Sequence, residues 1–268
     1  MDFVTTFADR ADLEKARGLL EGRGIPYQVI DAAPGYSRVG AGALATSAEG
    51  RFAIGADMNV TDSGWVDYRP ASRAIPPGPP DAFVEDLFGE AAIMVLAPCV
   101  ADLTRIRLIA HLSGDLTDVL PYLNAEMRNG FYNPNVPALT FMDGPRMIVV
   151  YANRITVAKA EELVDAWRTL EGLRRLVNQT WARRGEIKPS SQMRAKPPAL
   201  EIYRRLPGSN CQACGEKTCM AFAVRLWGGQ LSPSLCAPVF AGEQRRLKPA
   251  LLEICAGLGV VSQDGEKR

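Results

Sequence analysis

The first quarter of the chain alternates between short β-rich runs and one helical pattern. Residues 3–7 (FVTTF) are short and β-branched, and residues 26–33 (PYQVIDAA) alternate in the manner of a half-buried strand. Between them, residues 11–24 carry apolar side chains at helical spacing and stop at a glycine. The pattern predicts strand, helix and strand, a small α/β domain of the βαβ type over residues 1–75.

A proline-rich segment follows and predicts a linker. Residues 76–80 (PPGPP) contain four prolines, which hold the backbone in extended conformations. Beyond it, residues 91–100 (AAIMVLAPCV) form an apolar run that fits a buried strand or a short helix, because periodicity does not distinguish the two.

The middle of the chain switches between strand-like and helix-like patterns. Residues 104–113 alternate as a strand, and residues 115–130 read as a helix that Pro121 breaks or kinks. Two β-rich runs on either side of an Asp-Gly turn then predict a hairpin over residues 138–152.

A long amphipathic helix is predicted over residues 157–184. Its apolar stripe consists of Leu163, Trp167, Leu170, Leu173, Val177 and Trp181. Together with the preceding elements this reads β-α-β-β-α, which we assign to a central domain over residues 82–186.

The last part of the chain reads as a small separate module. Residues 186–198 form an extended connector, residues 199–240 form a cysteine-containing module, and a final helix follows within 241–258. The predicted fold class is therefore α+β, with an N-terminal βαβ piece, the central β-α-β-β-α domain and a C-terminal helix-loop module.

The composition is that of an ordinary globular protein, with 47% hydrophobic and 23% charged residues. No apolar run approaches the ~18 residues that span a bilayer, and the N-terminus lacks the basic start and apolar core of a secretory signal. Six cysteines, four of them clustered, fit a reducing compartment in which thiols bind metal. We therefore expect a cytoplasmic protein without a transmembrane segment.

The net charge of +1 hides an asymmetry between the two halves. Residues 1–145 contain 11 Lys and Arg against 19 Asp and Glu, and residues 146–268 contain 20 against 11, so the halves carry −8 and +9. Either the halves complement each other or the basic part docks an acidic partner. No dense Lys/Arg run with interleaved aromatic residues is present, so nucleic acid is not an expected partner.

Four cysteines near the C-terminus carry the clearest chemical signal. Cys211, Cys214, Cys219 and Cys236 follow the pattern C-x2-C-x4-C-x16-C. Three thiolates from one tight loop, with a fourth returned by a helix-length excursion, suit a cubane iron–sulfur cluster. These four residues are the predicted ligands.

The residues between the ligands fit the same interpretation. Gly215 lets the backbone pass close to a cluster, where amides can donate hydrogen bonds to its sulfurs. Thr218 is a predicted helix N-cap, which puts Cys219 at the positive end of the helix and favours its thiolate. Phe222 and Leu226 share a helix face with Cys219, so the helix presents an apolar wall beside the ligand.

Zinc is the competing interpretation of the four cysteines. A structural zinc site normally uses two closely spaced ligand pairs, whereas here the last ligand is a lone Cys236. The single histidine, His111, is far away in sequence. The common ferredoxin spacings do not match either, so an ordinary ferredoxin loop is not predicted.

Residues 200–229 (LEIYRRLPGSNCQACGEKTCMAFAVRLWGG) closely resemble a known iron–sulfur domain. It belongs to the large subunit of the corrinoid/iron–sulfur protein, and also occurs in the acetyl-CoA decarbonylase/synthase complex and, more loosely, in the B subunit of the Rnf electron-transport complex. In that family four cysteines hold a [4Fe-4S] cluster, and the resemblance implies the same for Cys211, Cys214, Cys219 and Cys236. Ala237 departs from the family, in which proline often follows the last ligand directly.

Two further resemblances carry no activity to this chain. Residues 103–198 resemble a region that accompanies this cluster domain in proteins of anaerobes, and no function comes with the likeness. The corrinoid protein also has a barrel and a B12-binding domain, which the 28 residues after the module cannot hold, so we do not expect corrinoid binding. Residues 1–45 resemble a small selenium/sulfur-carrier-like domain, but its Cys-Gly is Ala41-Gly42 here, so sulfur carriage is not expected.

Two weaker motifs have ordinary structural interpretations. Gly40 and Gly42 match the sequence pattern of a dinucleotide-binding fingerprint, but no strong strand precedes them. A glycine turn is therefore the better interpretation. Asp115 and Asp118 precede an apolar run and read as the start of a helix rather than as an acid–base pair.

The remaining candidate side chains do not form a catalytic set. His111 reads as a surface or edge histidine, and Cys99 and Cys255 lie among apolar residues as expected of buried core thiols. With one histidine in the chain, a Ser/His/Asp or Cys/His arrangement is not indicated. Four cysteine ligands would also leave no open position on a cluster, so the sequence favours an accessory protein over an enzyme.

The leading functional hypothesis is a non-enzymatic electron-transfer or redox-accessory protein. Its [4Fe-4S] cluster would pass single electrons to a redox partner protein, such as a corrinoid protein, a reductase or a membrane redox complex. Two alternatives stay open: a maturation factor that delivers its cluster to a client, and a structural role in which the cluster staples about 40 residues. The sequence does not indicate the oligomeric state.

Overall fold

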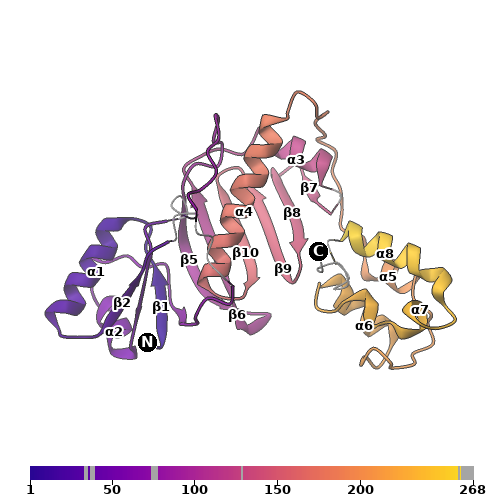
Figure 1. The fold of residues 1–268 in the computed structure, drawn as a ribbon, viewed down its shortest axis with the longest axis horizontal. Coiled ribbons are helices and arrows are strands. Elements are labelled where there is room, and N and C mark those ends of the chain that lie inside the picture. Colours follow the sequence, from indigo (N-terminus) through magenta and orange to yellow (C-terminus); the bar gives the residue numbers. More distant parts are fainter. Residues whose placement is uncertain (33–35, 37–39, 74–77, 128, 259, 261–268) are drawn as a thin grey trace. The chain divides into compact units, whose positions relative to one another are not determined.

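The computed structural model describes the chain in two compact units. The described residues are all of 1–268 except 33–35, 37–39, 74–77, 128, 259 and 261–268. The first unit comprises Met1–Tyr122 with Val150–Lys188, and the second comprises Leu123–Val149 with Pro189–Arg268 (Figure 1). Part of the predicted proline linker lies outside the described residues, and the predicted domain boundaries stay a prediction.

The N-terminal part folds as a four-stranded antiparallel sheet with two helices. Its elements are β1 (Phe3–Thr6), α1 (Arg10–Gly22), β2 (Tyr27–Ile30), β3 (Ala43–Thr46), α2 (Ala48–Gly55) and β4 (Val66–Asp67). The strand order β2-β3-β1-β4 with antiparallel neighbours is a β-α-β-β-α-β split arrangement of the ferredoxin-like type. The predicted strand, helix and strand are confirmed, and β3, α2 and β4 extend them.

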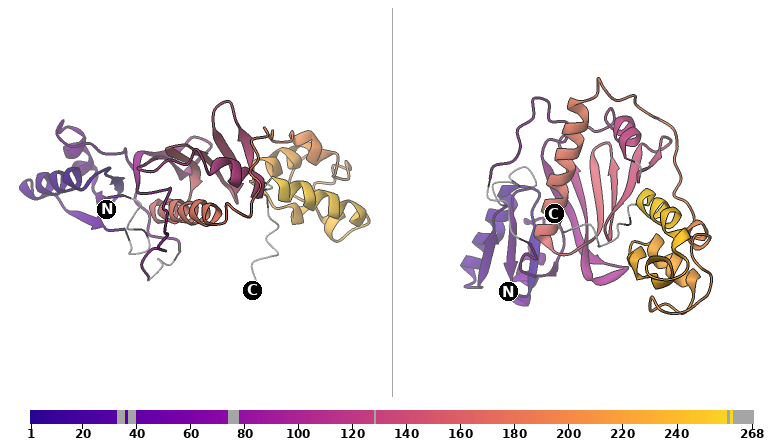
Figure 2. Two further views of the ribbon diagram at one scale, coloured as in Figure 1. Left: turned by 90° about the horizontal axis from the view of Figure 1, so that it is seen from above. Right: turned by 45° about the vertical axis from the view of Figure 1, so that its right-hand side comes forward.

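Local capping and packing explain the two helices of this sheet. Asp9 is the N-cap of α1, because its carboxylate accepts a hydrogen bond from the Asp12 backbone N–H at 2.9 Å. Ser47 is the N-cap of α2 in the same way, with its hydroxyl accepting from the Gly50 backbone N–H. The helices pack against each other in the views of Figures 1 and 2. The buried core beneath them consists of Phe7, Leu13, Ala16, Leu20, Ile25, Leu44, Ala53 and Ile54.

The second sheet has six strands in the order β5-β6-β10-β9-β8-β7, so β6 lies beside β10 and the chain crosses to the far edge between β6 and β7. Its strands are β5 (Ala91–Cys99), β6 (Asp102–Leu112), β7 (Phe131–Asn133), β8 (Ala138–Asp143), β9 (Arg146–Tyr151) and β10 (Arg154–Ala160). The accompanying helices are α3 (Leu120–Glu126) and α4 (Leu163–Ala182). The predicted strand over 104–113 and the hairpin over 138–152 are confirmed, and the apolar run at 91–100 is a strand.

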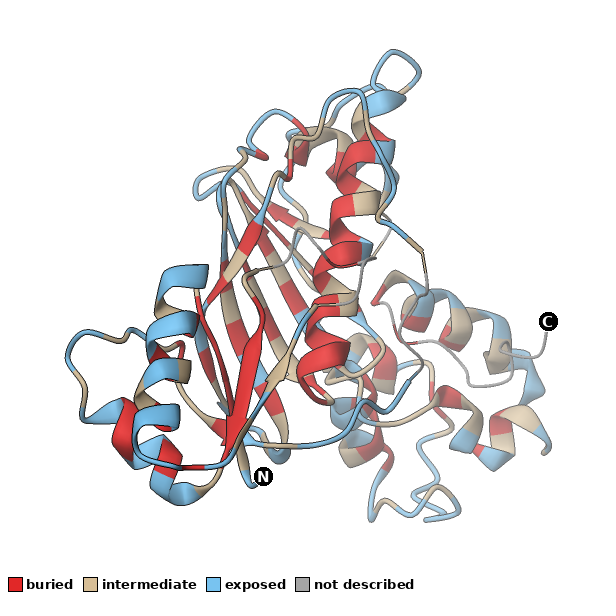
Figure 3. Cartoon of the chain, turned by 60° about the vertical axis from the view of Figure 1, so that its left-hand side comes forward, coloured by how far each residue is buried: buried red, intermediate tan, exposed pale blue. Residues whose placement is uncertain are grey.

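Two helix predictions in this part were wrong in their extent. Residues 154–160 are strand β10, so the long helix begins at Leu163, where the buried Glu162 carboxylate accepts hydrogen bonds from two backbone N–H groups of the first turn. Helix α3 spans only Leu120–Glu126, and Pro121 lies in its first turn instead of kinking it, because proline lacks the N–H that the first turn leaves unbonded. Figure 3 marks the buried stripe of α4 beside the strands.

A buried ion network fixes the segment before β5 against α4. Arg174 is 0% exposed, and its guanidinium donates to both carboxylate oxygens of Glu171, to Asp86 at 2.8 Å and to the Asp81 carbonyl at 2.7 Å. Asn178 adds a hydrogen bond to Asp86 at 2.7 Å. Burial raises the pKa of Asp86, but hydrogen bonds from Asn178 and the Gly89 backbone, together with Arg174, outweigh it and hold that pKa below its usual value.

In the second unit, one arginine holds the connector against the end of α3. Arg194 donates to the Asn124 side-chain oxygen at 2.9 Å and to the Met127 carbonyl at 2.9 Å, and Asn124 donates to the Ser190 carbonyl at 2.7 Å. The Arg194 backbone N–H donates to the Tyr132 carbonyl at 3.2 Å. Hydrogen bonds at Ser190 and Arg194 therefore hold the predicted extended connector in place.

The C-terminal module is helical and has its own apolar core. Its elements are α5 (Ala199–Tyr203), α6 (Cys219–Trp227), η2 (Pro233–Leu235), α7 (Ala237–Phe240), η3 (Arg245–Leu247) and α8 (Lys248–Gly257) (Figures 1 and 2). The buried core consists of Ile202, Leu206, Cys219, Phe222, Ala223, Leu226, Cys236, Val239, Leu251, Cys255, Leu258 and Val260. None of the described helices has the length and apolar character to span a membrane.

The end of α6 is fixed by contacts from the rest of the second unit. The Trp227 indole N–H donates to the Pro197 carbonyl at 2.8 Å, and the Lys196 ammonium donates to the Trp227 carbonyl at 2.7 Å while lying 3.7 Å from the centre of the indole ring. Gly229 follows with φ 65°, and a Cβ there would lie 2.9 Å from the Gly144 carbonyl oxygen of the β8–β9 turn. Only glycine fits this close approach.

Candidate metal centre

The structure brings the four predicted ligands around one small pocket. Cys211, Cys214, Cys219 and Cys236 all line it, although the last lies 17 residues after the third in sequence. Cys219 and Cys236 are buried, Cys214 is half-buried and Cys211 is exposed. All four are free thiols, so the pocket presents sulfur donors from its buried floor to its solvent edge.

The loop around Cys211 has an unusual backbone. Asn210 and Gln212 have φ of 51° and 61°, and Gly215 has φ 83°, so left-handed residues alternate with others along the loop. A residue other than Gly, Asn or Asp in this region, such as Gln212, costs about 1–2 kcal/mol relative to the ordinary conformation. Such alternation turns successive backbone N–H groups toward one side and makes the concave sites that bind anions and iron–sulfur clusters. The strained loop therefore fits an anionic cluster.

Asn210 connects this loop to the helix that carries Cys219. Its side-chain oxygen accepts a hydrogen bond from the Cys219 backbone N–H at 2.8 Å. Thr218 is the N-cap of α6, with its hydroxyl accepting from the Ala221 backbone N–H at 3.0 Å, as predicted. Cys219 is consequently the first residue of α6, at the positive end of the helix. The positioning role of Asn210 was not predicted, because it depends on the left-handed loop.

We expect substitutions at Asn210 to separate its two contributions. Asn210→Gly loses only the hydrogen bond to the Cys219 backbone N–H, about 1 kcal/mol, whereas Asn210→Ala also carries the left-handed penalty of about 1–2 kcal/mol. Asn210→Asp keeps the acceptor and should resemble the native protein. Denaturant titration of the reconstituted protein, followed by the visible absorption of its cluster, measures the stability of each variant. We expect the Asp variant to be the most stable of the three, the Gly variant to follow and the Ala variant to be the least stable. Equal stability of the Gly and Ala variants would contradict the backbone argument.

Cys236 is held at the start of the short helix α7. Its carbonyl accepts hydrogen bonds from the Val239 and Phe240 backbone N–H groups, both at 3.0 Å, and Pro238 lies in the first turn. Burial raises the pKa of the Cys236 thiol, the Val239 N–H partly opposes it, and the neighbouring cysteines raise it further. Cys236 would hold a metal as its thiolate, so it would lose that proton when the metal binds.

The wall and rim of the pocket come from α6 and the loop before it. Phe222, Ala223 and Leu226 are at most 1% exposed, which confirms the predicted apolar face of the helix. The Glu216 carboxylate accepts a hydrogen bond from Arg225 on α6 and so ties the loop to the helix. Within the described part of the chain, no three His, Cys, Asp or Glu side chains lie close enough together to hold one metal ion, and this includes the four cysteines. A four-iron cluster does not need such an approach, because each thiolate would bind a different iron.

The other candidate residues lie elsewhere and in ordinary environments. Cys99 and Cys255 are 3% and 0% exposed, so both are core thiols as predicted, and burial raises the pKa of Cys255 to about 11. His111 is an exposed residue of β6, as predicted for a surface histidine. Gly40 and Gly42 have φ of 119° and 113° and lead into strand β3, so the helix of a dinucleotide fingerprint does not follow them.

The predicted helix start at Asp115 was wrong by several residues. The Asp115 carboxylate accepts a hydrogen bond from the Thr117 backbone N–H at 2.7 Å and closes a turn, and α3 begins at Leu120. The short polar side chain competes with the helix for backbone donors, which favours a turn here.

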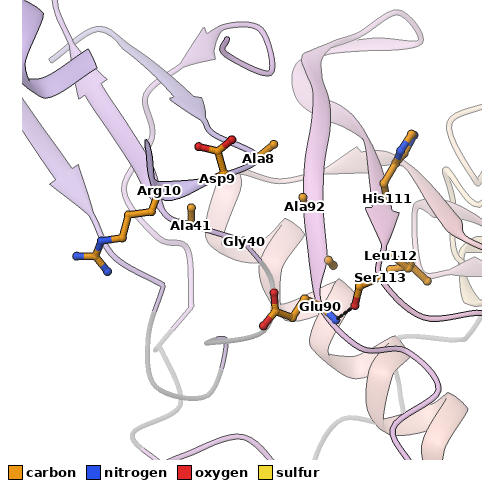
Figure 4. A pocket seen from close by; sticks show the side chains of 11 residues that line it. Ala8, Asp9, Arg10, Gly40, Ala41, Glu90, Ala92, His111, Leu112 and Ser113 are labelled. Carbon is orange, nitrogen blue, oxygen red and sulfur yellow. Dashed lines mark hydrogen bonds between the residues drawn. The ribbon is translucent and has the colours of Figure 1, made fainter. Parts of the chain in front are cut away.

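A second pocket lies in the first unit beside the start of α1. Its polar lining residues are Asp9, Arg10, Glu90, His111 and Ser113. Figure 4 shows the Arg10 and His111 side chains directed away from each other, while the Ser113 hydroxyl is bonded to the Glu90 backbone N–H. These groups do not converge on a common point, so the cysteine pocket remains the candidate site.

Comparison with known proteins supports the same segment. Residues 206–238 match a family model described as "Putative Fe-S cluster". This segment therefore resembles an iron–sulfur domain. The chain is similar to the acetyl-CoA decarbonylase/synthase complex subunit gamma 2 of Methanosarcina thermophila, with 41% identity over 69 residues, which are 22% of this chain and 15% of that protein.

Similar matches extend the comparison to a second kind of protein. The corrinoid/iron-sulfur protein large subunit of Moorella thermoacetica is 38% identical over 64 residues, which are 22% of this chain and 14% of that protein. The decarbonylase/synthase gamma subunit of Methanothermobacter thermautotrophicus is 39% identical over 64 residues, with the same two coverages. The chain thus spans about a seventh of these relatives, and no solved structure matches it. The predicted resemblance to both proteins is confirmed for this segment.

Proposed function

We propose that the chain binds one [4Fe-4S] cluster through Cys211, Cys214, Cys219 and Cys236 and exchanges single electrons with a partner protein. The observation that carries the proposal is the shared pocket of these four cysteines inside the segment that matches the iron–sulfur family. An all-thiolate donor set suits iron–sulfur clusters and zinc, and the lone fourth ligand after 16 residues favours the cluster. When bound, the cluster supplies one-electron redox chemistry.

The residues around the pocket suit a charged cofactor close to the surface. A cubane with four thiolates carries a net charge of about −2 when oxidised. The positive end of α6 at Cys219 and the left-handed loop around Cys211 stabilise that charge. The buried Cys219 and Cys236 hold the inner side, whereas the exposed Cys211 lies at the solvent edge, where a partner can approach.

The hydrophobic core of the module favours an electron-transfer role for the cluster over a purely structural one. A cluster that merely staples a segment is needed where a chain is too short to bury its own core. Here 12 buried residues of the module pack together, and α5, α6 and α8 contribute to them.

The reducing environment that such thiols require is consistent with a cytoplasmic location. The relatives are named as subunits of larger proteins, which supports a partner protein for this chain.

Anaerobic reconstitution followed by protein-film voltammetry tests the proposal. We expect about four iron and four sulfide ions per chain and one reversible one-electron wave. Stoichiometric zinc without acid-labile sulfide in anaerobically purified protein would contradict the cofactor assignment. A complete cluster that cannot be reduced reversibly would contradict the redox role and leave the ligand set standing.

A further inference from the structure

One acidic residue lines the cysteine pocket. In the loop between the second and third cysteines, Gly215 and Lys217 are exposed, whereas Glu216 between them is half-buried and its side chain is only 15% exposed. Among the described residues that line the pocket, Glu216 is the one Asp, Glu, Lys or Arg. The charge nearest to the four thiols on the wall of the pocket is therefore negative.

A carboxylate at this place acts against the charge of the proposed cofactor. A cubane with four thiolates carries about −2 when oxidised and one more negative charge when reduced. Glu216 is two residues from Cys214 and three from Cys219, so it adds a like charge close to two of the ligands. Repulsion between like charges grows with each added electron, so Glu216 disfavours the reduced state more than the oxidised one.

Arg225 on α6 supplies the opposite charge. Its guanidinium donates a hydrogen bond to the Glu216 carboxylate and another to the Gln230 side-chain oxygen at 3.3 Å. The Arg225 side chain is 47% exposed, so water and salt screen its charge more than they screen the charge of Glu216. The pair is neutral in sum, but its negative member is the more buried one and the one that lines the pocket.

We propose that the Glu216–Arg225 pair sets the reduction potential of the cluster: Glu216 holds the potential low, and Arg225 offsets part of that effect. The proposal rests on the redox function proposed above. In the electron-transfer step one electron passes from a reduced partner protein to the cluster, the partner is oxidised by one electron, and no bond is made or broken. The potentials of such clusters depend on net charge and solvent exposure, and the pair acts through the charge.

A purely structural ion pair makes a different prediction. If the pair only ties the loop to α6, losing either member breaks the same contact, so both losses should change the site in the same direction. If the charges act on the cluster, losing Glu216 and losing Arg225 must shift the potential in opposite directions, because the two charges have opposite signs. The signs of the two shifts therefore distinguish the two roles.

The test is protein-film voltammetry of the full-length reconstituted protein. Glu216→Gln and Arg225→Gln each remove one charge and keep a side chain that can form a hydrogen bond. Arg225→Lys keeps the positive charge and changes only the shape of the donor. Glu201→Gln is the matched control, because Glu201 belongs to the same module, is paired with Arg204 and Arg205 and does not line the pocket. Iron and sulfide analysis accompanies each variant.

We expect Glu216→Gln to favour reduction about tenfold, which is an upward shift of about 59 mV for one electron. Arg225→Gln should shift the potential downward by a smaller amount, because its charge is more exposed, and Arg225→Lys and Glu201→Gln should stay near the native potential. An unchanged potential in Glu216→Gln would overturn the proposal, as would shifts of the same sign in the two charge-removing variants. Loss of iron from both of those variants would show that the pair is structural and would also overturn it.

The same measurement separates this proposal from the function on which it rests. If the native protein gives a reversible wave whose position does not depend on Glu216, the redox function stands and the role of the pair fails. If the native protein gives no reversible wave while Glu216→Gln gives one, the redox function fails and the control of the potential by the pair stands. If neither protein gives a reversible wave, both proposals fail.

Discussion

Cys236→Ala is expected to strip the protein of its iron and sulfide. The native chain should carry about four of each and the variant far fewer, because the loss of one thiolate leaves one iron of the cluster without its protein ligand. Cys236 is the ligand that the chain returns from the far side of the pocket, and its side chain is 6% exposed, so neither water nor a neighbouring side chain replaces it readily. Iron and acid-labile sulfide analysis of anaerobically reconstituted protein measures the loss.

A buried cysteine of the same module provides the matched control. Cys255 is 0% exposed in the core of the module and does not line the cysteine pocket. Cys255→Ala should therefore keep the full iron and sulfide content and lose only a small amount of packing, about 1 kcal/mol. Full iron and sulfide in Cys236→Ala would contradict its assignment as a ligand. If Cys255→Ala lost the cluster and Cys236→Ala kept it, Cys255 rather than Cys236 would be the fourth ligand.

Arg174→Ala is expected to lower the free energy of unfolding by about 3–5 kcal/mol. Removing the guanidinium leaves Glu171, whose side chain is 3% exposed, with only Arg175 at 3.4 Å, and takes the Arg174 cation away from the half-buried Asp86. It also leaves the Asp81 carbonyl without its donor, so the segment before β5 loses its attachment to α4. Urea denaturation followed by far-ultraviolet circular dichroism measures the change.

A surface ion pair gives the comparison for this effect. Arg17 pairs with Glu14 at 2.8 Å, with the two side chains 37% and 46% exposed. Arg17→Ala should cost far less than Arg174→Ala, because solvent screens an exposed pair. If Arg174→Ala were no more destabilising than Arg17→Ala, the buried network would not hold the segment in place.

Elements with strong local signals were predictable, and short or ambiguous ones were not. The Asp-Gly hairpin and the helix before Gly24 follow from turn chemistry and periodicity. Strand β3 is four residues of Ala, Leu and Thr, a run too short to show a period. Strand β10 passes into α4 after only two residues, so their apolar positions read as one long helix until the Glu162 cap is seen.

The candidate site was also predictable from the sequence only in part. Cysteine spacing alone placed all four thiols of the pocket, and Thr218 was predictable as a cap from its place before an apolar helix. Asn210 was not, because its contact with the Cys219 backbone exists only after the loop adopts left-handed conformations. The Arg174 network was also beyond prediction, since its partner Asp86 lies 88 residues away in sequence.

The core of the C-terminal module comes largely from one stretch of the chain. Its fully buried residues all lie in Ile202–Val260, and Phe131, Gly144 and Pro197 contact the module from outside that stretch, so a different chain would have to supply only a few matching contacts. A segment with this property can be recombined between otherwise unrelated proteins and keep its shape. That property gives a physical basis for relatives that align with this chain over only 64 to 69 residues, at 38–41% identity.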